Sequence, residues 1–183
     1  AYRYKLSARR ISQLAKMNRH AQRSGRIPRE KGRSKLATTM DGGTREALID
    51  PHGRRVNSLR VSITQRCNFN CFFCHQEGES GPDGEATPEE IETIVSVAAE
   101  LGIGKVKITG GEPLLREDVV EIVQRISAHV DEVSMTTNGY LLAERACDLK
   151  EAGLDRVNVS FHSGDPDVFC KIIGSDSYPK VRT

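Results

Sequence analysis

From residue 59 onward the sequence alternates short β-rich runs with longer amphipathic runs, and this alternation constrains the fold more than any other feature. The predicted strands are residues 59–64, 105–109, 133–137 and 156–161. The predicted helices are residues 87–101, 117–128 and 141–152, with a fourth that begins near Asp165. Strands that alternate with helices of this length form βαβ units, which build a parallel sheet. We therefore predict an α/β fold.

The loops that follow the predicted strands hold the least ordinary residues of the chain. They carry three cysteines within 67–74, Gly-Gly-Glu-Pro at 110–113, Thr-Thr-Asn-Gly at 136–139 and Asn-Val-Ser at 158–160. Barrels and open α/β sheets place their chemistry at this edge. A closed barrel needs more than four strands, so we expect the chain to be the front half of a larger, truncated fold.

Charge divides the chain into two parts. Residues 1–40 carry twelve Lys and Arg and one acidic residue, whereas residues 41–183 carry fifteen Lys and Arg and twenty-four acidic residues. We predict a flexible basic extension over 1–40 and an incomplete core domain over 41–183. Three interpretations of the extension stay open: an arm that binds RNA or another polyanion, a solvated tail without a role, or sequence upstream of a natural start at Met40.

Composition argues against several classes of protein. There is no run of about 18 apolar residues, so we predict no membrane-spanning helix. No apolar signal-peptide stretch lies near the start, which predicts a cytoplasmic location. Aromatic residues make up 5% of the chain and Trp is absent, which argues against a surface that stacks nucleic-acid bases. We expect neither a membrane nor a nucleic acid as a partner.

Three of the five cysteines, Cys67, Cys71 and Cys74, lie within eight residues. In a cytosolic chain such a cluster indicates a metal site rather than disulfides. Cubic iron–sulfur clusters usually take four Cys ligands, so three ligands leave one iron open. The alternatives are a zinc knuckle and an electron-transfer cluster that borrows a fourth ligand, for which the adjacent His75 is a candidate.

The run C-N-F-N-C-F-F-C at residues 67–74 resembles the CxxxCx(aromatic)C signature of the radical S-adenosylmethionine (SAM) superfamily. The resemblance implies the N-terminal half of a partial (βα)6 TIM-like barrel, with a [4Fe–4S] cluster on Cys67, Cys71 and Cys74. It implies that SAM chelates the open iron and that the reduced cluster cleaves SAM to release a 5′-deoxyadenosyl radical. The implied SAM contacts are Phe73 through its backbone, Gly110, Gly111, Glu112, Asn158 and Ser160.

Five further segments resemble the GTP 3′,8-cyclases, which are radical SAM enzymes of molybdenum cofactor synthesis. The resemblance is closer to archaeal members. The segments are residues 48–54, 59–68, 108–116, 136–140 and 158–163. This resemblance implies that Arg60, Lys107 and Thr136 bind GTP. Cations and hydroxyl donors suit the negative charge of a triphosphate. The implied reaction is hydrogen abstraction from the 3′ carbon of the GTP ribose, followed by attack on purine C8.

Two positions depart from the family pattern. Lys107 stands where many relatives have Arg, so a point charge replaces a bidentate fork. Residues 64–66 read Thr-Gln-Arg, where Thr-Asp-Arg is common.

The resemblance also implies partners and a second cofactor. An electron donor such as ferredoxin or flavodoxin would reduce the cluster, and the next enzyme of the molybdopterin pathway would receive the product. A second [4Fe–4S] cluster is expected from the C-terminal half of such enzymes. The alternatives are another radical SAM maturase, or an inactive fragment that binds an iron–sulfur cluster or zinc.

Overall fold

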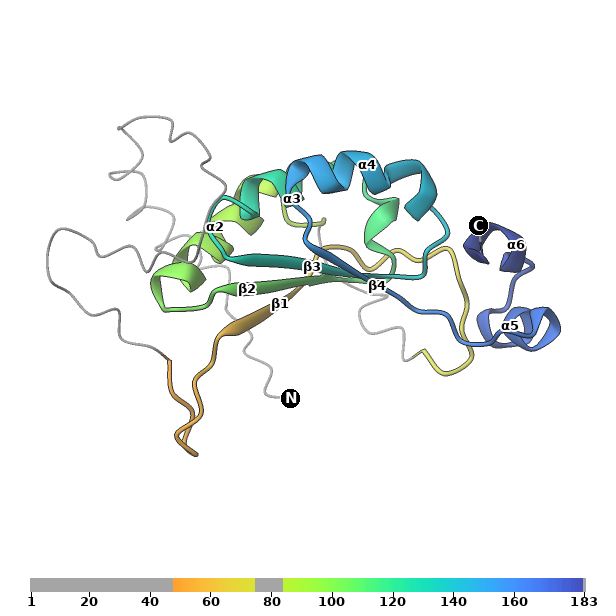
Figure 1. The fold of residues 1–183 in the computed structure, drawn as a ribbon, viewed down its shortest axis with the longest axis horizontal. Coiled ribbons are helices and arrows are strands. Elements are labelled where there is room, and N and C mark those ends of the chain that lie inside the picture. Colours follow the sequence, from red (N-terminus) through yellow and green to blue (C-terminus); the bar gives the residue numbers. More distant parts are fainter. Residues whose placement is uncertain (1–47, 75–83, 183) are drawn as a thin grey trace, which may run out of the picture. The chain divides into compact units, whose positions relative to one another are not determined.

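Four parallel strands form one sheet whose order follows the chain (Figure 1). The computed structural model describes residues 48–74 and 84–182, which all belong to one compact unit, Thr44–Thr183. The strands are β1 (Ser58–Ser62), β2 (Lys105–Thr109), β3 (Glu132–Thr137) and β4 (Arg156–Val159). Each pairs with the next in parallel register. Their carboxyl ends therefore meet at one edge of the sheet.

Three helices connect these strands and cover the same face of the sheet (Figure 1). They are α2 (Pro88–Glu100), α3 (Val119–Ile126) and α4 (Leu142–Ala152). Alternate strand residues point to this face, and four of those on β2 and β3 are apolar and at most 1% exposed: Val106, Ile108, Val133 and Met135. Burial of such side chains removes apolar surface from water and holds the helix layer on the sheet.

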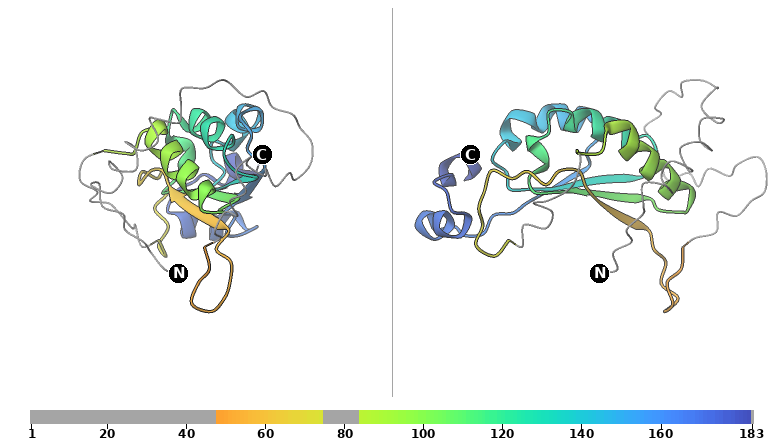
Figure 2. Two further views of the ribbon diagram at one scale, coloured as in Figure 1. Left: turned by 90° about the vertical axis from the view of Figure 1, so that its left-hand side faces the viewer. Right: turned by 180° about the vertical axis from the view of Figure 1, so that it is seen from behind.

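The opposite face of the sheet carries no helix among the described residues, as the two further views show (Figure 2). The strand residues that alternate with the core are polar on this face, namely Ser58, Arg60, Ser62, Lys105, Lys107, Thr109, Glu132, Ser134, Thr136, Arg156 and Asn158. A parallel sheet with one apolar and one polar face fits a barrel wall whose polar side lines an interior.

Two short helices, α5 (Pro166–Ile173) and α6 (Tyr178–Arg182), lie beyond the carboxyl end of the sheet (Figure 1). They form a small second core around Phe169, Ile173 and Tyr178. Phe69 and Cys71 pack against this core. Both belong to residues 64–74, called the cysteine segment below. The cysteine segment is thus part of the folded structure at this edge.

The α/β prediction and its parallel sheet are confirmed, and differences occur at the ends of elements. β4 ends at Val159 rather than residue 161, because its neighbour β3 ends at Thr137 and offers no further partner. The helix predicted at 117–128 begins only at Val119, after a 3-10 turn, η1 (Pro113–Leu115). Neither η1 nor α6 was predicted.

Some predictions fall outside the described residues. The basic extension at 1–40 and the candidate ligand His75 are among them, so both stay predictions. Within residues 48–74 and 84–182, no helix has the length and apolar character needed to cross a bilayer.

Candidate functional site

The cysteine segment runs along the carboxyl edge of the sheet, and its first part is bonded to the loop after β2. The Gly111 amide donates to the Thr64 carbonyl (2.9 Å), and the Glu112 amide donates to the Arg66 carbonyl (2.8 Å). A Cβ on Gly110 would lie 2.6 Å from the Thr64 carbonyl oxygen, and one on Gly111 would lie 2.4 Å from that of Arg66. Because only glycine permits this approach, the Gly-Gly pair seats the cysteine segment.

The last part of the cysteine segment is bonded to the end of α5. The Asn70 amide donates to the Ile173 carbonyl (2.9 Å), and the Phe72 amide donates to the Ile172 carbonyl (3.2 Å). Gly174 ends α5 in the left-handed conformation, with φ 69°, and a Cβ there would lie 2.9 Å from the Asn70 carbonyl oxygen. The backbone that carries the cysteines is therefore held from both sides.

Cys67, Cys71 and Cys74 lie in this segment as free thiols. Partial desolvation raises the pKa of Cys67, and the charges of Glu112 and Cys74 add to this effect. Desolvation also raises the pKa of Cys71, again with contributions from the other two cysteines. Since iron binds thiolates, cluster assembly would release their protons.

Three thiols on one loop are the type of donor that an iron–sulfur cluster takes. Within the described part of the chain, no three His, Cys, Asp or Glu side chains are grouped around a single ion position.

Glu112 is fully buried where β2 ends. Its Oε1 accepts hydrogen bonds from the Thr137 hydroxyl (2.7 Å) and the Leu114 amide (3.0 Å), and its Oε2 accepts one from the Asn138 amide (2.7 Å). The carboxylate therefore joins the loop after β2 to the loop after β3. Because a carboxylate offers about four acceptor positions, it can still accept one further donor.

The other residues predicted to bind SAM lie on β4 and on the cysteine segment. Asn158 is in register beside Thr136 of β3. Ser160 follows the end of β4, and its amide donates to β3 at 2.8 Å. Phe73 packs edge-on against His162 of the loop after β4, with 4.9 Å between the ring centroids. The loop after β4 therefore meets the cysteine segment at Phe73.

The three residues predicted to bind GTP share the polar face of the sheet. Arg60 of β1 is the register partner of Lys107 of β2, and Lys107 in turn is the partner of Ser134. Thr136 lies two residues beyond Ser134, closer to the cysteine edge, on the same face. The ion pairs of residues 48–74 and 84–182 include Lys105 and Arg156 on this face, but neither Arg60 nor Lys107.

The amino end of the same face is different, because its charges are already paired. The Glu132 carboxylate lies 3.3 Å from the Lys105 ammonium and 3.1 Å from the Arg156 guanidinium. Positive charge without a described acidic partner therefore lies at the middle of the polar face, on Arg60 and Lys107.

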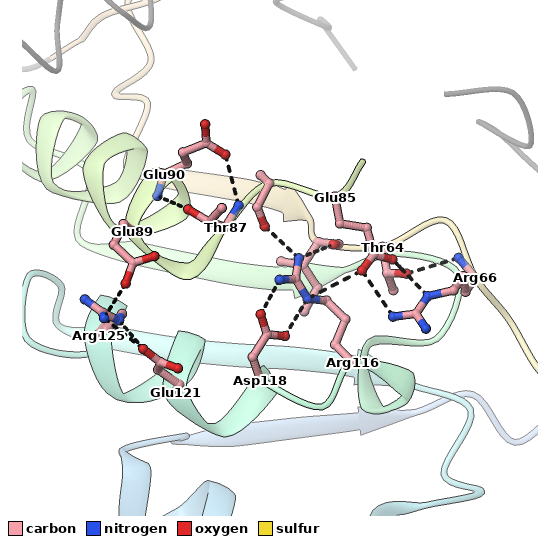
Figure 3. A network of polar contacts seen from close by, with 12 residues as sticks. Thr64, Arg66, Glu85, Thr87, Glu89, Glu90, Arg116, Asp118, Glu121 and Arg125 are labelled. Atoms are coloured by element: carbon pink, nitrogen blue, oxygen red, sulfur yellow. Dashed lines mark hydrogen bonds and ion pairs between the residues drawn. The ribbon is translucent and has the colours of Figure 1, made fainter. Parts of the chain in front are cut away.

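A polar network that was not predicted from the sequence joins Thr64 and Arg66, which precede the cysteines, to Glu85 (Figure 3). Glu85 accepts hydrogen bonds from the Thr64 hydroxyl and from the Arg66 guanidinium, the latter at 3.0 and 3.1 Å. Desolvation would raise the pKa of Glu85, but these donors outweigh it and the pKa is lowered. In the Thr-Gln-Arg run at residues 64–66, Thr64 and Arg66 thus bind Glu85. Nothing in the structure explains Gln65, the residue that departs from the family pattern.

Arg116 extends this network into the protein (Figure 3). Its side chain is 5% exposed, and it donates to the carbonyls of Ile63 and Ala86, both at 2.8 Å. It also forms a two-pronged pair with Asp118, the residue that directly precedes α3. Arg116 is the last residue of the 108–116 segment that resembles the family. The sequence analysis assigned it no role.

Comparison with known proteins agrees with this geometry. Residues 61–182 match the family model of the Radical SAM superfamily. The chain belongs to the radical SAM superfamily. The cofactors of this superfamily are a [4Fe–4S] cluster and SAM, as the resemblance of residues 67–74 implied.

Curated relatives place the chain more narrowly within radical SAM proteins. It is 56% identical over 135 residues to a probable GTP 3′,8-cyclase of Thermococcus kodakarensis, which covers 73% of this chain and 44% of the relative. Identity is 54% over 136 residues to the protein of that name from Pyrococcus abyssi, with the same coverage. These archaeal sources agree with the predicted archaeal-like form. The chain spans less than half the length of these relatives.

Two solved structures share the fold. BtrN, in complex with AdoMet and 2-DOIA, matches with a TM-score of 0.53 at 23% identity, over 61% of this chain and 48% of BtrN. Streptococcus suis SuiB, bound to the precursor peptide SuiA, matches with a TM-score of 0.58 at 16% identity, over 94% of this chain and 42% of SuiB. At these identities the likeness concerns the fold, which agrees with the predicted TIM-like radical SAM core.

Proposed function

We propose that this chain is the N-terminal part of the radical SAM core of a GTP 3′,8-cyclase. The observation that carries the proposal is the pair of adjacent cations, Arg60 and Lys107, on the polar face below the cysteine edge. A triphosphate needs such donors, and curated relatives that are about half identical carry the name of this enzyme.

The proposal assigns each cluster of residues a ligand. Cys67, Cys71 and Cys74 hold the [4Fe–4S] cluster and leave one iron open. The SAM contacts are the Phe73 backbone, Gly110, Gly111, Glu112, Asn158 and Ser160. The GTP contacts are Arg60, Lys107 and Thr136. When bound, the cluster and SAM supply a one-electron cleavage that yields methionine and a 5′-deoxyadenosyl radical.

The residues of this chain then position the substrate and limit side reactions. Arg60 and Lys107 orient the triphosphate on the polar face, while Thr136 stands closer to the cysteine edge, two residues beyond the Lys107 layer. This order supports a pose in which the ribose and base of GTP lie between the cations and the cofactor edge. The reaction proposed is removal of the 3′ hydrogen of the ribose and closure onto purine C8.

Isotope transfer tests the reaction in the full-length protein, reconstituted anaerobically with iron and sulfide. With GTP deuterated at the ribose 3′ position, we expect deuterium in the 5′-deoxyadenosine that is formed. Formation of 5′-deoxyadenosine without dependence on GTP would contradict the proposal and indicate another radical SAM reaction. One zinc per chain without acid-labile sulfide would contradict the cluster itself.

Two lysines of β2 provide a matched pair for the substrate site. Lys107→Ala removes a cation without a described acidic partner, so we expect the KM for GTP to rise roughly 10- to 100-fold. Lys105→Ala removes a cation that Glu132 already engages, on the same face of the same strand, and should leave the KM within about twofold. Equal effects of the two variants would argue against a triphosphate beside Lys107.

The remaining partners follow from the proposed reaction. A cluster that is reduced in each turnover requires a one-electron donor, for which ferredoxin or flavodoxin is suitable, and a later molybdopterin enzyme would take the product. A second [4Fe–4S] cluster would come from residues that correspond to the C-terminal half of the relatives. A cytoplasmic location suits these reduced cofactors.

A further inference from the structure

The middle of the cysteine segment is held by a hydrogen bond between two side chains. Asn138 Nδ2, from the loop after β3, donates to Asn68 Oδ1 at 2.8 Å. Asn68 directly follows Cys67 in the chain. This contact can be removed by substitution, unlike the main-chain bonds at residues 64, 66, 70 and 72.

Asn138 is itself held in place by two contacts. Its Oδ1 accepts a hydrogen bond from the Tyr140 amide (2.9 Å), so its Nδ2 is the group that faces Asn68. Its backbone amide donates to the buried Glu112 carboxylate (2.7 Å). The Thr137 hydroxyl donates to the same carboxylate and accepts from the Gly139 amide (3.0 Å). The turn that holds Asn138 thus fixes the position of its Nδ2 group.

The contacts along the cysteine segment follow the order of the strands. Residues 64 and 66 bond to the loop after β2, residue 68 bonds to the loop after β3, and residues 70 and 72 bond to α5, which follows β4. The three groups of contacts thus hold the cysteine segment along its length, with Asn68 at a bend between them. Cys67, between residues 66 and 68, is exposed, whereas Cys71 is half-buried against the second core.

We propose that Asn138 is a positioning residue that sets Cys67 relative to the Gly110–Glu112 loop by means of Asn68. Asn138 contacts no cysteine and is not proposed to contact SAM or GTP; it acts on the backbone that carries the cluster ligand. The effect on the cluster ligand and on SAM binding rests on the proposed function. The placement of the segment itself can be measured without them.

A double-mutant cycle with hydrogen exchange on the metal-free full-length protein tests this placement. In the wild-type background, Asn68→Ala should speed amide exchange of residues 67–72 by roughly 3- to 10-fold, the factor expected for one lost hydrogen bond. In the Asn138→Ala background, the same change should have no further effect, because both substitutions remove one shared contact. Exchange in β2 and β3 should not change.

Ser163→Ala provides the matched control. The Ser163 hydroxyl accepts a hydrogen bond from the Asp165 amide (3.1 Å) in the loop after β4, a contact that is equally exposed and does not involve the cysteine segment. This variant should leave exchange of residues 67–72 unchanged. Additive effects of the two Asn substitutions, no effect of Asn68→Ala, or an equal effect of Ser163→Ala would each overturn the proposal.

The loaded enzyme gives a second, separate readout. After reconstitution, Asn68→Ala and Asn138→Ala should bind as much iron and sulfide as wild type. The SAM concentration that changes half of the electron paramagnetic resonance signal of the reduced cluster should rise roughly 3- to 10-fold. An unchanged SAM requirement would overturn the proposed effect on Cys67. If wild type itself bound no cluster, the proposed function would fail, and the metal-free cycle would still decide the role of Asn138.

Discussion

Arg116 is a buried cation on which the loops around the cysteine segment depend. It donates to two carbonyls from different parts of the chain, Ile63 and Ala86, and it pairs with Asp118. Buried charge is costly unless it is paired and hydrogen-bonded, and Arg116 satisfies both conditions. The hydrogen bond from the Arg116 guanidinium, together with its charge, lowers the pKa of Asp118.

The Arg116–Asp118 pair predicts a pH-dependent stability. Because the folded pKa of Asp118 lies below its unfolded value of about 3.9, its stabilisation is fully present above that value and is lost as pH falls through the folded pKa. Asp118→Asn should therefore lower the unfolding free energy by about 1–2 kcal/mol at pH 7, and by progressively less below about pH 4. Urea unfolding of both proteins from pH 7 to pH 3 measures this difference. A difference that stays constant over this range would contradict the assignment.

Among the secondary-structure elements, α5 has a role that its position in the sequence does not reveal. A helix that begins near Asp165 was predicted, and in the structure Asp165 caps it and Pro166 opens it. Its contact with residues 70 and 72 joins positions about 100 apart in the sequence, and no local pattern encodes such a pairing. The same limit applies to η1 and to the start of α3 at Val119, between which Arg116 makes its tertiary bonds.

Gly174→Ala tests the contact between α5 and the cysteine segment. The substitution places a Cβ at φ 69° and 2.9 Å from the Asn70 carbonyl oxygen, so we expect a loss of about 1–2 kcal/mol in unfolding free energy. Exchange of the Asn70 amide should also become faster. The matched control is Gly164→Ala, where a Cβ would meet nothing within 4 Å. Equal stability of the two variants would show that α5 does not constrain the segment.

On the scale of the whole molecule, the sequence predicted the layers and the edge at which the candidate site lies. The alternation of strands and helices predicted one parallel sheet, and the parallel sheet in turn brought 67–74, 110–113 and 158–160 to one edge. The internal bonds of that edge were not predictable. Glu112 and Asn138 bind each other across two loops, and Glu85 closes the cysteine segment from 19 residues beyond Arg66. Such contacts depend on the folded geometry rather than on local pattern.

The central claim is that three cysteines hold a cluster whose fourth iron binds SAM. Electron–nuclear double resonance of the reduced, reconstituted full-length protein measures this contact, with SAM that carries ¹⁵N in its amino group or ¹⁷O in its carboxylate. We predict hyperfine coupling from both labels, and loss of cluster and coupling together in Cys71→Ala. A reduced [4Fe–4S] signal that shows no coupling to either label at saturating SAM would contradict the claim.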